Sequence, residues 1–474
     1  MSNQVRPNFV VIMTDDQGAW ASGRTMPELI TPTLDSLGAT GHEITRFFCA
    51  SPVCSPARAS LLTGRTPSAH GVHDWIRGDS DGNPSPGVHY LERFDTTPEV
   101  LNRAGYNCGH SGKWHLGDPR TPAPGFSDWY SHRDGSGPYF QAPVISGGAE
   151  FVEDQYITHA ITEHADGMLH EMLARDDPFF LEVNYTAPHS PWSAENHPSS
   201  YRELYKGCTF PSVPRPAPHP WFDWNHVELA DAMRNPEENL IGYCAALTAV
   251  DNGVAQLLET LENARAREDT YVIFMSDNGF SCGHHGIWGK GNGTNPLNLW
   301  DESILVPFVI NRPGTITPQL DSTLTAATSL HPTILELAGV DFPIDRLAAG
   351  TSFAHRLTHT TETNLCPAAS DDIVIFDEYG GTRMIRTVDY KYVWRANGGP
   401  EELYDLANDP EEHNSVHSLQ RYSGTREELR HRLQDWFTAH SDPIYDAANR
   451  PISGNGQNMP VWFANNDSER YAPG

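Results

Sequence analysis

Short apolar runs alternate along this chain with longer segments in which apolar residues recur at helical spacing. The runs "NFVVIM" (8–13), "PFFLEVNY" (178–185) and "TYVIFM" (270–275) predict buried strands. Segment 153–174 repeats its apolar residues at helical spacing, and segment 237–263 is predicted to be a second long helix. Alternating strands and helices are typical of an α/β fold, in which a large, mostly parallel sheet is sandwiched by helices.

The pattern changes near residue 370. "DIVIFDEY" (372–379) and "TRMIRTVDYKYVWR" (382–395) predict antiparallel strands, and "TREELRHRLQDWFTAH" (425–440) predicts one amphipathic helix. Because the chain has 474 residues, more than a single core usually organises, we expect two domains. They are an α/β domain over residues 1–370 and a small α+β domain with an antiparallel sheet over residues 371–474.

The charge balance is strongly acidic, with 61 Asp and Glu against 32 Lys and Arg and a formal net charge of -29. Such a surface repels nucleic acid, because that binding depends on Lys and Arg displacing counterions from phosphates. It also repels anionic substrates at long range, so any anion site must be locally basic or hold a metal.

The seven cysteines form an odd set without a C-x-x-C pair, so neither a disulfide framework nor a thiolate zinc site is predicted. The apolar run Phe9–Met13 is too short for a signal peptide or a membrane span. We therefore expect a cytoplasmic protein without a membrane partner, or a periplasmic or secreted one if a signal precedes the sequence as written.

Polar residues follow the predicted strands at the points where they end. Asp15 and Asp16 follow the first strand, His189 lies just past the second, and Asp277 and Asn278 follow the third. Ligands of open α/β sheets lie outside the carboxyl ends of the strands, and oxygen-bearing side chains there suit a hard divalent cation. Alternatively, Asp and Asn in such places are ordinary turn formers and helix caps.

A lone thiol stands in "CSPARASLLTGR" (54–65), which predicts the start of a helix. Cys54 or Ser55 is expected to cap it, with Pro56 at the first helical position and Arg58 one turn further on. Exposed backbone N–H groups and a guanidinium suit a tetrahedral anion facing Cys54. The alternative is a buried structural cysteine, which is the reading we apply to Cys49, Cys108, Cys244 and Cys366.

These residues resemble the type I sulfatases, the formylglycine-dependent branch of the alkaline-phosphatase-like superfamily. The C-x-P-x-R signature, the leucine-containing turn and the Gly-Arg that follow it are all present at 54–65. Further family motifs occur in order at 14–18 ("TDDQG"), 112–117 ("GKWHLG"), 187–192 ("APHSPW"), 276–279 ("SDNG"), 289–291 ("GKG") and, in the small domain, 390–412 ("YKYVW" to "EELYDLANDPEE"). In combination these motifs are highly specific, and they span most of the chain.

The resemblance implies that a separate maturation enzyme oxidises Cys54 to formylglycine, whose aldehyde hydrates to a geminal diol. It also implies one bound Ca²⁺, rather than Mg²⁺, held with residue 54 by Asp15, Asp16, Asp277 and Asn278. A serine in this place would form a stable sulfate ester, whereas a diol can lose sulfate when a base removes its second proton.

The remaining family roles are carried over position by position. Arg58 and Lys113 are expected to hold residue 54 and the sulfate oxygens, and His115 to act as the base that expels sulfate. His189 and Lys290 are expected to contact the bridging oxygen and protonate the departing alkoxide. Each of these side chains has a structural alternative as a solvated lysine or a satisfied loop histidine.

The substrate is predicted to be a small sulfated mono- or oligosaccharide, with the small domain contributing to the substrate cleft. Aromatic and charged residues close in sequence to the motifs are candidates for contacting a sugar, since rings with charged neighbours suit its faces; they are Trp75, Arg77, His284, His285 and Trp288. Packing in the core is the alternative for each.

Other functions remain open on sequence alone. A phosphonate monoester or phosphodiester hydrolase resembles sulfatases and uses the same modified residue and a similar metal site. Cys54 could instead act as a thiolate whose pKa is lowered by the helix start and Arg58. A catalytically inactive carbohydrate-binding protein on the same scaffold would bind sugar without turnover.

Overall fold

The computed structural model describes residues 6–78, 85–343, 346–357, 374–396, 398–463 and 466–473. Its centre is a ten-stranded sheet in the order β14-β2-β13-β9-β1-β8-β4-β5-β6-β7. The parallel centre of this sheet comprises β9 (Thr270–Ser276), β1 (Asn8–Thr14), β8 (Phe179–Asn184), β4 (Asn107–Lys113) and β5 (Asp128–His132). Antiparallel pairs flank it through β13 (Phe308–Asn311), β2 (His42–Ile44), β6 (Ala142–Ser146) and β7 (Ala149–Glu153), and β14 (Gln319–Asp321) completes the β2 edge in parallel.

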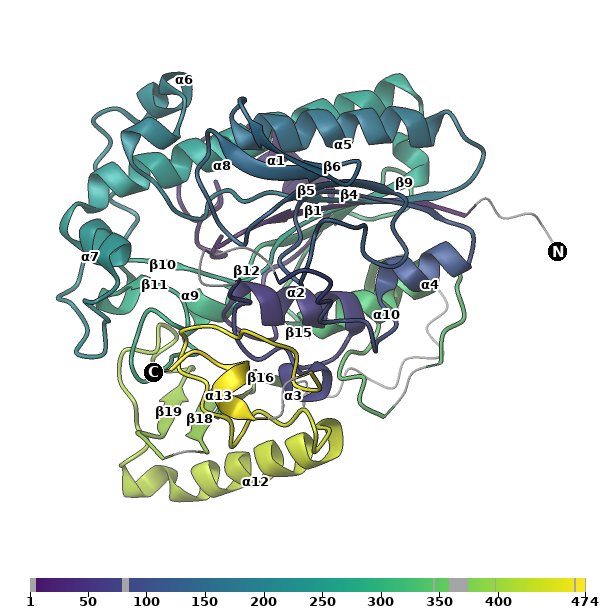
Figure 1. Cartoon of the computed structure of the whole chain (residues 1–474). Helices are drawn as coiled ribbons and strands as arrows, with labels where there is room; N and C mark the ends of the chain where they lie inside the picture. The colour runs from purple at the N-terminus through teal and green to yellow at the C-terminus, as the bar shows by residue number, and fades with distance from the viewer. Residues whose placement is uncertain are drawn as a thin grey trace.

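Helices cover both faces of the sheet (Figure 1), which confirms the predicted α/β class. Along β1, Phe9, Val11 and Met13 belong to one hydrophobic core, while Val10 and Ile12 belong to the other. The helices α1 (Pro32–Thr40), α5 (Ile157–Leu173) and α8 (Pro236–Asn263) cover one face, and α2 (Cys54–Thr63), α4 (Thr97–Arg103) and α10 (Leu330–Leu337) cover the other.

The apolar pattern locates β1, β8, β9 and α8 closely, but it misses a strand at the centre of the sheet. β4 has the sequence "NCGHSGK" and is buried from Cys108 to Lys113. One of its small residues is required by close packing. Gly112 lies against the backbone of β8, where a Cβ would come within 2.0 Å of the Asn184 carbonyl oxygen. The strand was not predicted because a buried, functional strand need not be hydrophobic.

The predicted cap of the helix at residue 54 is wrong by one or two positions. The N-cap of α2 is Val53, so Cys54 is the first helical residue, and no side chain caps the helix. Pro56 therefore stands two residues into the helix. Ser55 is buried, and its hydroxyl accepts a hydrogen bond from the backbone N–H of Ile76 at 3.0 Å.

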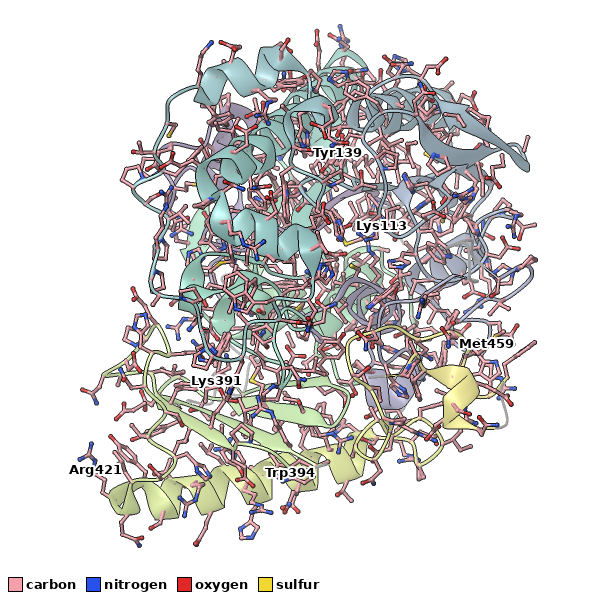
Figure 2. The ribbon with its side chains drawn as sticks, turned by 60° about the vertical axis from the view of Figure 1, so that its left-hand side comes forward. Lys113, Tyr139, Lys391, Trp394, Arg421 and Met459 are labelled. Carbon is pink, nitrogen blue, oxygen red and sulfur yellow. The ribbon has the colours of Figure 1, made fainter. Side chains whose placement is uncertain are left out.

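The C-terminal part forms a four-stranded antiparallel sheet, as predicted, covered on one face by α12 (Ser423–His440). Its strands are β16 (Ile375–Tyr379), β17 (Thr382–Arg386), β18 (Tyr390–Arg395) and β19 (Glu402–Asp405). In Figure 2 this sheet and α12 form the lower layer of the molecule, with Arg421 at its far tip from Lys113. After α12 the chain returns to the main body, where Gln457 pairs with Ile76.

Two earlier predictions fall outside the described residues: the structural role of Cys366 and the domain boundary at residues 370–371. Within the described ranges, no helix combines the length and apolarity needed to cross a membrane.

Candidate active site

Polar residues from two neighbouring strands meet at the carboxyl end of the sheet. Thr14, the last residue of β1, is in register with Ser276, the last residue of β9. The residues that follow are hydrogen-bonded: the Asp16 N–H donates to Asp277 Oδ1 at 3.3 Å, and Asn278 Nδ2 donates to Asp16 Oδ1 at 2.7 Å. The acid pair after β1 and the Asp-Asn pair after β9 thus lie together, fully buried.

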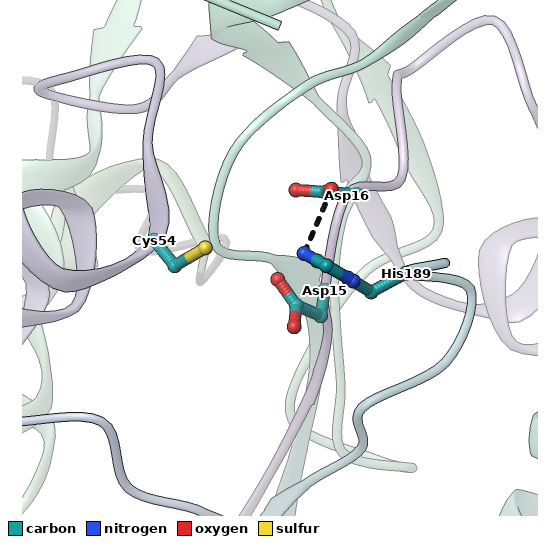
Figure 3. A group of neighbouring side chains, drawn as sticks. All are labelled: Asp15, Asp16, Cys54 and His189. Carbon is teal, nitrogen blue, oxygen red and sulfur yellow. Dashed lines mark ion pairs between the residues drawn. The ribbon is translucent and has the colours of Figure 1, made fainter. Parts of the chain in front are cut away.

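Cys54 faces this group from the start of α2 (Figure 3). One ligand atom from each of Asp15, Asp16, Cys54 and His189 lies within 4.8 Å of every other. Arg58, one turn along the helix, donates through Nε to Asp277 Oδ2 at 2.9 Å and through Nη1 to the Lys113 carbonyl at 2.9 Å. The helix start is therefore joined to the ends of both β9 and β4.

The lysines predicted to contact sulfate are buried with the carboxylates. Lys113 Nζ lies 2.5 Å from Asp15 Oδ2, and Lys290 pairs with Asp16 Oδ1 and donates to Cys54 Sγ at 3.0 Å. The structure thus brings Arg58, Lys113 and Lys290 to the same group of buried carboxylates beside residue 54. We call this group of buried charges, together with the histidines described below, the inner end of the site.

Burial and charge set the protonation of this inner end. Burial raises the pKa of the Cys54 thiol to about 11, although Lys113 and Lys290 act in the opposite direction. The sulfur is therefore protonated at neutral pH, which disfavours a thiolate nucleophile. Burial is the largest influence on Asp15 and opposes its ionisation, but the positive charges of Lys113, His189 and Arg58 together hold the pKa of Asp15 below its ordinary value.

His115 has the hydrogen bonding of a neutral base. Its Nε2 lies 2.9 Å from the Ile76 carbonyl, an acceptor, so Nε2 carries the proton and Nδ1 has the free lone pair. Nδ1 is buried without a hydrogen-bond partner. Burial, reinforced by Lys113, holds the pKa of His115 well below its ordinary value, which keeps the ring neutral. Gly135 lies flat against this ring, since a Cβ there would come within 2.1 Å of Nε2.

His189 approaches from the loop after β8. Its Nε2 lies 3.6 Å from Asp16 Oδ2, and its Nδ1 lies 3.0 Å from the Ser190 carbonyl, to which it can donate. The Tyr139 hydroxyl donates to the His189 carbonyl at 2.7 Å and fixes the loop. His189 is thus held with its Nε2 pointing to the centre of the site, as Figure 3 shows.

A cavity of about 790 Å³ opens above this centre and includes Cys54, His115, His189 and Lys290 in its walls. Trp75 and Arg77 also line it, with Gly454, Asn455 and Pro473 from the C-terminal segment. We call Trp75–Gly78 together with these C-terminal residues the outer wall. Glu228 and Asn292, which sequence reasoning missed, line the cavity as well; both lie outside the motifs, so no local signal marks them.

The other candidate substrate contacts do not line this cavity. His284 packs its ring against Trp20, with ring centres 4.7 Å apart. His285 stacks on Trp300 and bonds to Glu302 at 2.7 Å. Trp288 is completely buried. The alternative of core packing therefore describes Trp288, whereas His284 and His285 are half-buried and are held by the neighbouring Trp20 and Trp300.

Oxygen atoms in the inner end fit a hard cation. Asp15 Oδ1 and Asn278 Oδ1 are buried and have no hydrogen-bond partner, although buried oxygens are normally satisfied. Carboxylate and amide oxygens are the ligands that Ca²⁺ prefers. Burial and the charge of Asp15 also raise the pKa of Asp277, so a bound cation would favour the ionised form of this carboxyl group.

Comparison with known proteins gives the family. A family model described as Sulfatase matches residues 7–340. The chain belongs to the sulfatase family. A second model, described as N-sulphoglucosamine sulphohydrolase, C-terminal, matches residues 283–439 of this sulfatase. The chain is therefore an enzyme that hydrolyses sulfate esters, as the motifs predicted.

Relatives of this sulfatase match over nearly its whole length. An ulvan-active sulfatase of Formosa agariphila is 29% identical over 493 residues, covering 97% of this chain and 88% of its own. A solved structure in complex with its substrate D-glucosamine-2-N,6-O-disulfate has a TM-score of 0.75 at 22% identity, covering 94% and 99% of the two chains. A phosphonate monoester hydrolase of Agrobacterium radiobacter has a TM-score of 0.70 at 22% identity, covering 92% and 96%.

Proposed function

We propose that this sulfatase releases inorganic sulfate from a small sulfated sugar, with residue 54 as formylglycine and a Ca²⁺ ion in the site. The observation that carries the proposal is the convergence of Cys54, Asp15 and Asp16 within 4.8 Å at the base of a cavity of about 790 Å³. The sugar is supported by the relatives, one active on ulvan and one fold neighbour bound to a sulfated glucosamine.

The cation would be held by Asp15, Asp16, Asp277 and Asn278, whose buried oxygens fit it. Once bound, Ca²⁺ neutralises negative charge and lowers the pKa of the hydroxyl of residue 54. Arg58 keeps its place through Asp277, and Lys113 and Lys290 supply positive charge for the sulfate oxygens.

Conversion of Cys54 to formylglycine requires a maturation enzyme as a transient partner. The modified residue supplies a geminal hydroxyl as nucleophile, which a cysteine protonated at neutral pH cannot replace. The intact C-x-P-x-R signature at 54–58 supports the conversion.

The histidines carry the proton transfers in this proposal. His115 accepts a proton at Nδ1, the nitrogen left free by the Nε2 bond to the Ile76 carbonyl. His189 donates a proton from Nε2 to the departing sugar oxygen, which requires the doubly protonated ring because its Nδ1–H is committed to the Ser190 carbonyl. Lys290, which pairs with Oδ1 of Asp16 while His189 faces Oδ2, contacts the same sugar oxygen and stabilises its negative charge.

The C-terminal part is proposed to form a domain over residues 371–474 that completes the substrate cleft. Gly454, Asn455 and Pro473 in the cavity wall support this role. A sugar bound above the sulfate site would meet backbone and amide groups from this segment, which suit hydroxyl groups.

The test uses enzyme co-produced with a formylglycine-generating enzyme, with modification of residue 54 verified by peptide mass. Sulfate release is measured from a panel of sulfated mono- and oligosaccharides and an aryl sulfate, beside a phosphonate monoester and a phosphodiester. We expect kcat/KM for the best sugar sulfate to exceed that for either phosphorus ester by at least about tenfold.

The competing function is a phosphonate monoester hydrolase, which the Agrobacterium radiobacter fold neighbour favours. Faster hydrolysis of the phosphonate ester than of every sulfate ester would select it. Hydrolysis of the aryl sulfate with no sugar sulfate turned over would reject the sugar and leave the sulfatase chemistry intact.

A further inference from the structure

Arg77 stands apart from the other charged residues of the cavity. It lines the outer wall and is exposed, and within the described residues its guanidinium has no hydrogen-bond or ion-pair partner. The chain has 61 acidic residues against 32 Lys and Arg, so an arginine without a carboxylate partner among the described residues is unusual here. An unpaired cation of this kind, facing a cavity, is available to a ligand.

The rest of the outer cavity has the opposite charge. Beyond the inner end, the other charged lining residues that the structure describes, histidine aside, are the carboxylates Asp134 and Glu228. Asp134 is engaged by the Arg133 guanidinium through bonds of 2.9 Å, and Glu228 accepts from the Ser190 hydroxyl at 2.9 Å. Among these described groups, only Arg77 can supply a cation to a bound substrate away from the sulfate being cleaved.

The backbone that carries Arg77 is fixed relative to the reacting groups. The preceding residue, Ile76, donates its N–H to Ser55, the neighbour of Cys54, at 3.0 Å. Its carbonyl accepts from His115 Nε2 at 2.9 Å. The N–H of Arg77 itself donates to the carbonyl of the buried Gln457 at 2.9 Å. Nucleophile, base and Arg77 are therefore linked by short hydrogen bonds.

The C-terminal segment holds this position from the other side. A Cβ on Gly456 would lie 3.1 Å from Arg77 Cβ and from the Trp75 ring, so the segment packs closely on both residues. Trp75 Nε1 donates to the Gly454 carbonyl at 2.9 Å. The guanidinium consequently extends into the cavity from a rigid base, which limits the distances at which it can meet a substrate group.

We propose that Arg77 binds a second acidic group of the sugar substrate, either a carboxylate or a second sulfate, and so selects sugars with two anionic groups. This inference rests on the proposed function, since it places the second group on the same substrate. A guanidinium binds either anion with paired N–H donors, and the chemistry is the same for both sources. Asp134 and Glu228, which line the same cavity, repel such a group, so a preference for doubly anionic sugars depends on Arg77.

The test compares matched pairs of substrates that differ only in the second anion. Glucosamine 2-N,6-O-disulfate is paired with N-acetylglucosamine 6-sulfate, whose acetamide is uncharged, and methyl glucuronoside 2-sulfate with its carboxyl methyl ester. The kcat/KM ratio within each pair is measured, and a sugar that is bound without turnover is assayed by its inhibition constant against 4-nitrophenyl sulfate. The pair with the larger ratio identifies the second group as sulfate or carboxylate.

We expect the wild-type enzyme to prefer the doubly anionic member of one pair by about tenfold or more, as charge-assisted bidentate bonds allow. Arg77→Gln should reduce that ratio to about twofold or less, Arg77→Lys should retain an intermediate ratio, and Arg77→Glu should reverse it. Raising the salt concentration should lower the wild-type ratio, because the guanidinium is exposed. Arg421→Gln, an exposed arginine at the far tip of the C-terminal layer in Figure 2, is the matched control and should keep the wild-type ratio.

A wild-type ratio near one in both pairs, or a ratio unchanged in Arg77→Gln, would overturn the inference while sulfate release from sugars upheld the proposed function. Absence of sulfate release from every sugar and from 4-nitrophenyl sulfate by enzyme with modified residue 54 would instead overturn the proposed function. Thermal unfolding of each variant verifies that the ratio is compared between folded proteins.

Discussion

The inner end and the outer wall of the cavity balance charge in different ways. At the inner end, Asp15, Asp16 and Asp277 are buried beside Arg58, Lys113 and Lys290, and nearly every charge has a partner within hydrogen-bond distance. The outer wall has one exposed guanidinium on a rigid backbone. In our proposals the buried inner end cleaves the sulfate ester, while the exposed guanidinium of the outer wall selects the substrate.

The largest expected effect is at the nucleophile. Cys54→Ala should abolish sulfate release, by at least about 1000-fold, because no other group can provide the attacking oxygen. Folding should survive, since only one sulfur atom is removed from the cavity base. Sulfate release and thermal unfolding are measured together, with Cys208→Ala, a half-buried cysteine away from the cavity, as control. Activity of Cys54→Ala near the wild-type level contradicts the assignment.

The second largest effect is expected at Asp277, the carboxylate that pairs with Arg58 at the inner end. Asp277→Asn removes a proposed calcium ligand and leaves Arg58 without its ion-pair partner at 2.8 Å. We expect activity to fall by about 100-fold or more and the unfolding free energy by about 3 kcal/mol, as for a broken buried pair.

Elemental analysis separates loss of bound calcium from loss of the Arg58 ion pair as the cause of the lower activity of Asp277→Asn. Bound calcium should fall below one per chain, whereas Asp321→Asn, which breaks a buried pair with Arg356 far along the sheet, should destabilise the protein without calcium loss. Stoichiometric calcium in Asp277→Asn would remove that residue from the metal site.

A smaller loss of activity is expected on substitution of Gly135, which lines the cavity and lies against the His115 ring. Its Cβ in Gly135→Ala would overlap the His115 ring, so the ring must move and the proton acceptor is displaced. We expect kcat to fall about 10- to 100-fold with little change in stability, because a displaced base loses part of the roughly 100- to 10000-fold that a positioned base contributes. Gly167→Ala on α5, where a Cβ meets nothing within 4 Å, is the control. Unchanged kcat in Gly135→Ala would contradict the role of His115.

The smallest effect is expected on the pH dependence of the unfolding free energy, through the buried residues that hold the outer wall in place. His73 is buried, bonds to Tyr471 and to the Tyr445 carbonyl, and burial lowers its pKa to about 4. The unfolded chain, with an ordinary histidine pKa near 6.5, takes up the proton first, so stability falls as the pH drops from about 6.5 to about 4. The contribution of this one group is at most about 3 kcal/mol.

Asp74, next to His73, accepts hydrogen bonds from the Gly454 and Gly456 N–H groups and changes stability with pH in the opposite direction. Burial raises its pKa to about 6, so its contribution falls as the pH rises from about 4 to about 6. We expect His73→Gln to make the slope of unfolding free energy against pH more negative in this range, and Asp74→Asn to make it more positive. Denaturant unfolding at several pH values checks both, and identical slopes in all variants would contradict the assignment.

Much of the inner end could be predicted from sequence because its residues occupy local positions with defined geometry. Apolar runs located β1 and β9, and the polar residues directly after each had to lie at the same edge of a parallel sheet. Cys54 and Arg58 stand one helical turn apart, so they share a face of α2. The polar strand β4 was missed because hydrophobic periodicity cannot identify a buried strand of Gly, Ser, His and Lys.

The outer wall lay beyond sequence reasoning for a different reason. Trp75 and Arg77 were named only for their chemical type and nearness to a motif. The same holds for His284, which packs half-buried against Trp20, and for Trp288, which is buried. Nothing local distinguishes the two outcomes. Gly135 likewise belongs to a glycine-rich segment whose contact with His115 has no sequence signature.

The sequence alone determined which groups are available and where each stands on its own strand or helix, because apolar periodicity and turn chemistry act over a few residues. Only the tertiary structure decided which groups meet: Lys290 reaches Cys54 across 236 positions and Arg58 reaches Asp277 across 219. Such contacts depend on the order of strands in the sheet and on the return of the C-terminal segment to Ile76. Those arrangements are set by burial summed over the whole chain, which no short segment encodes.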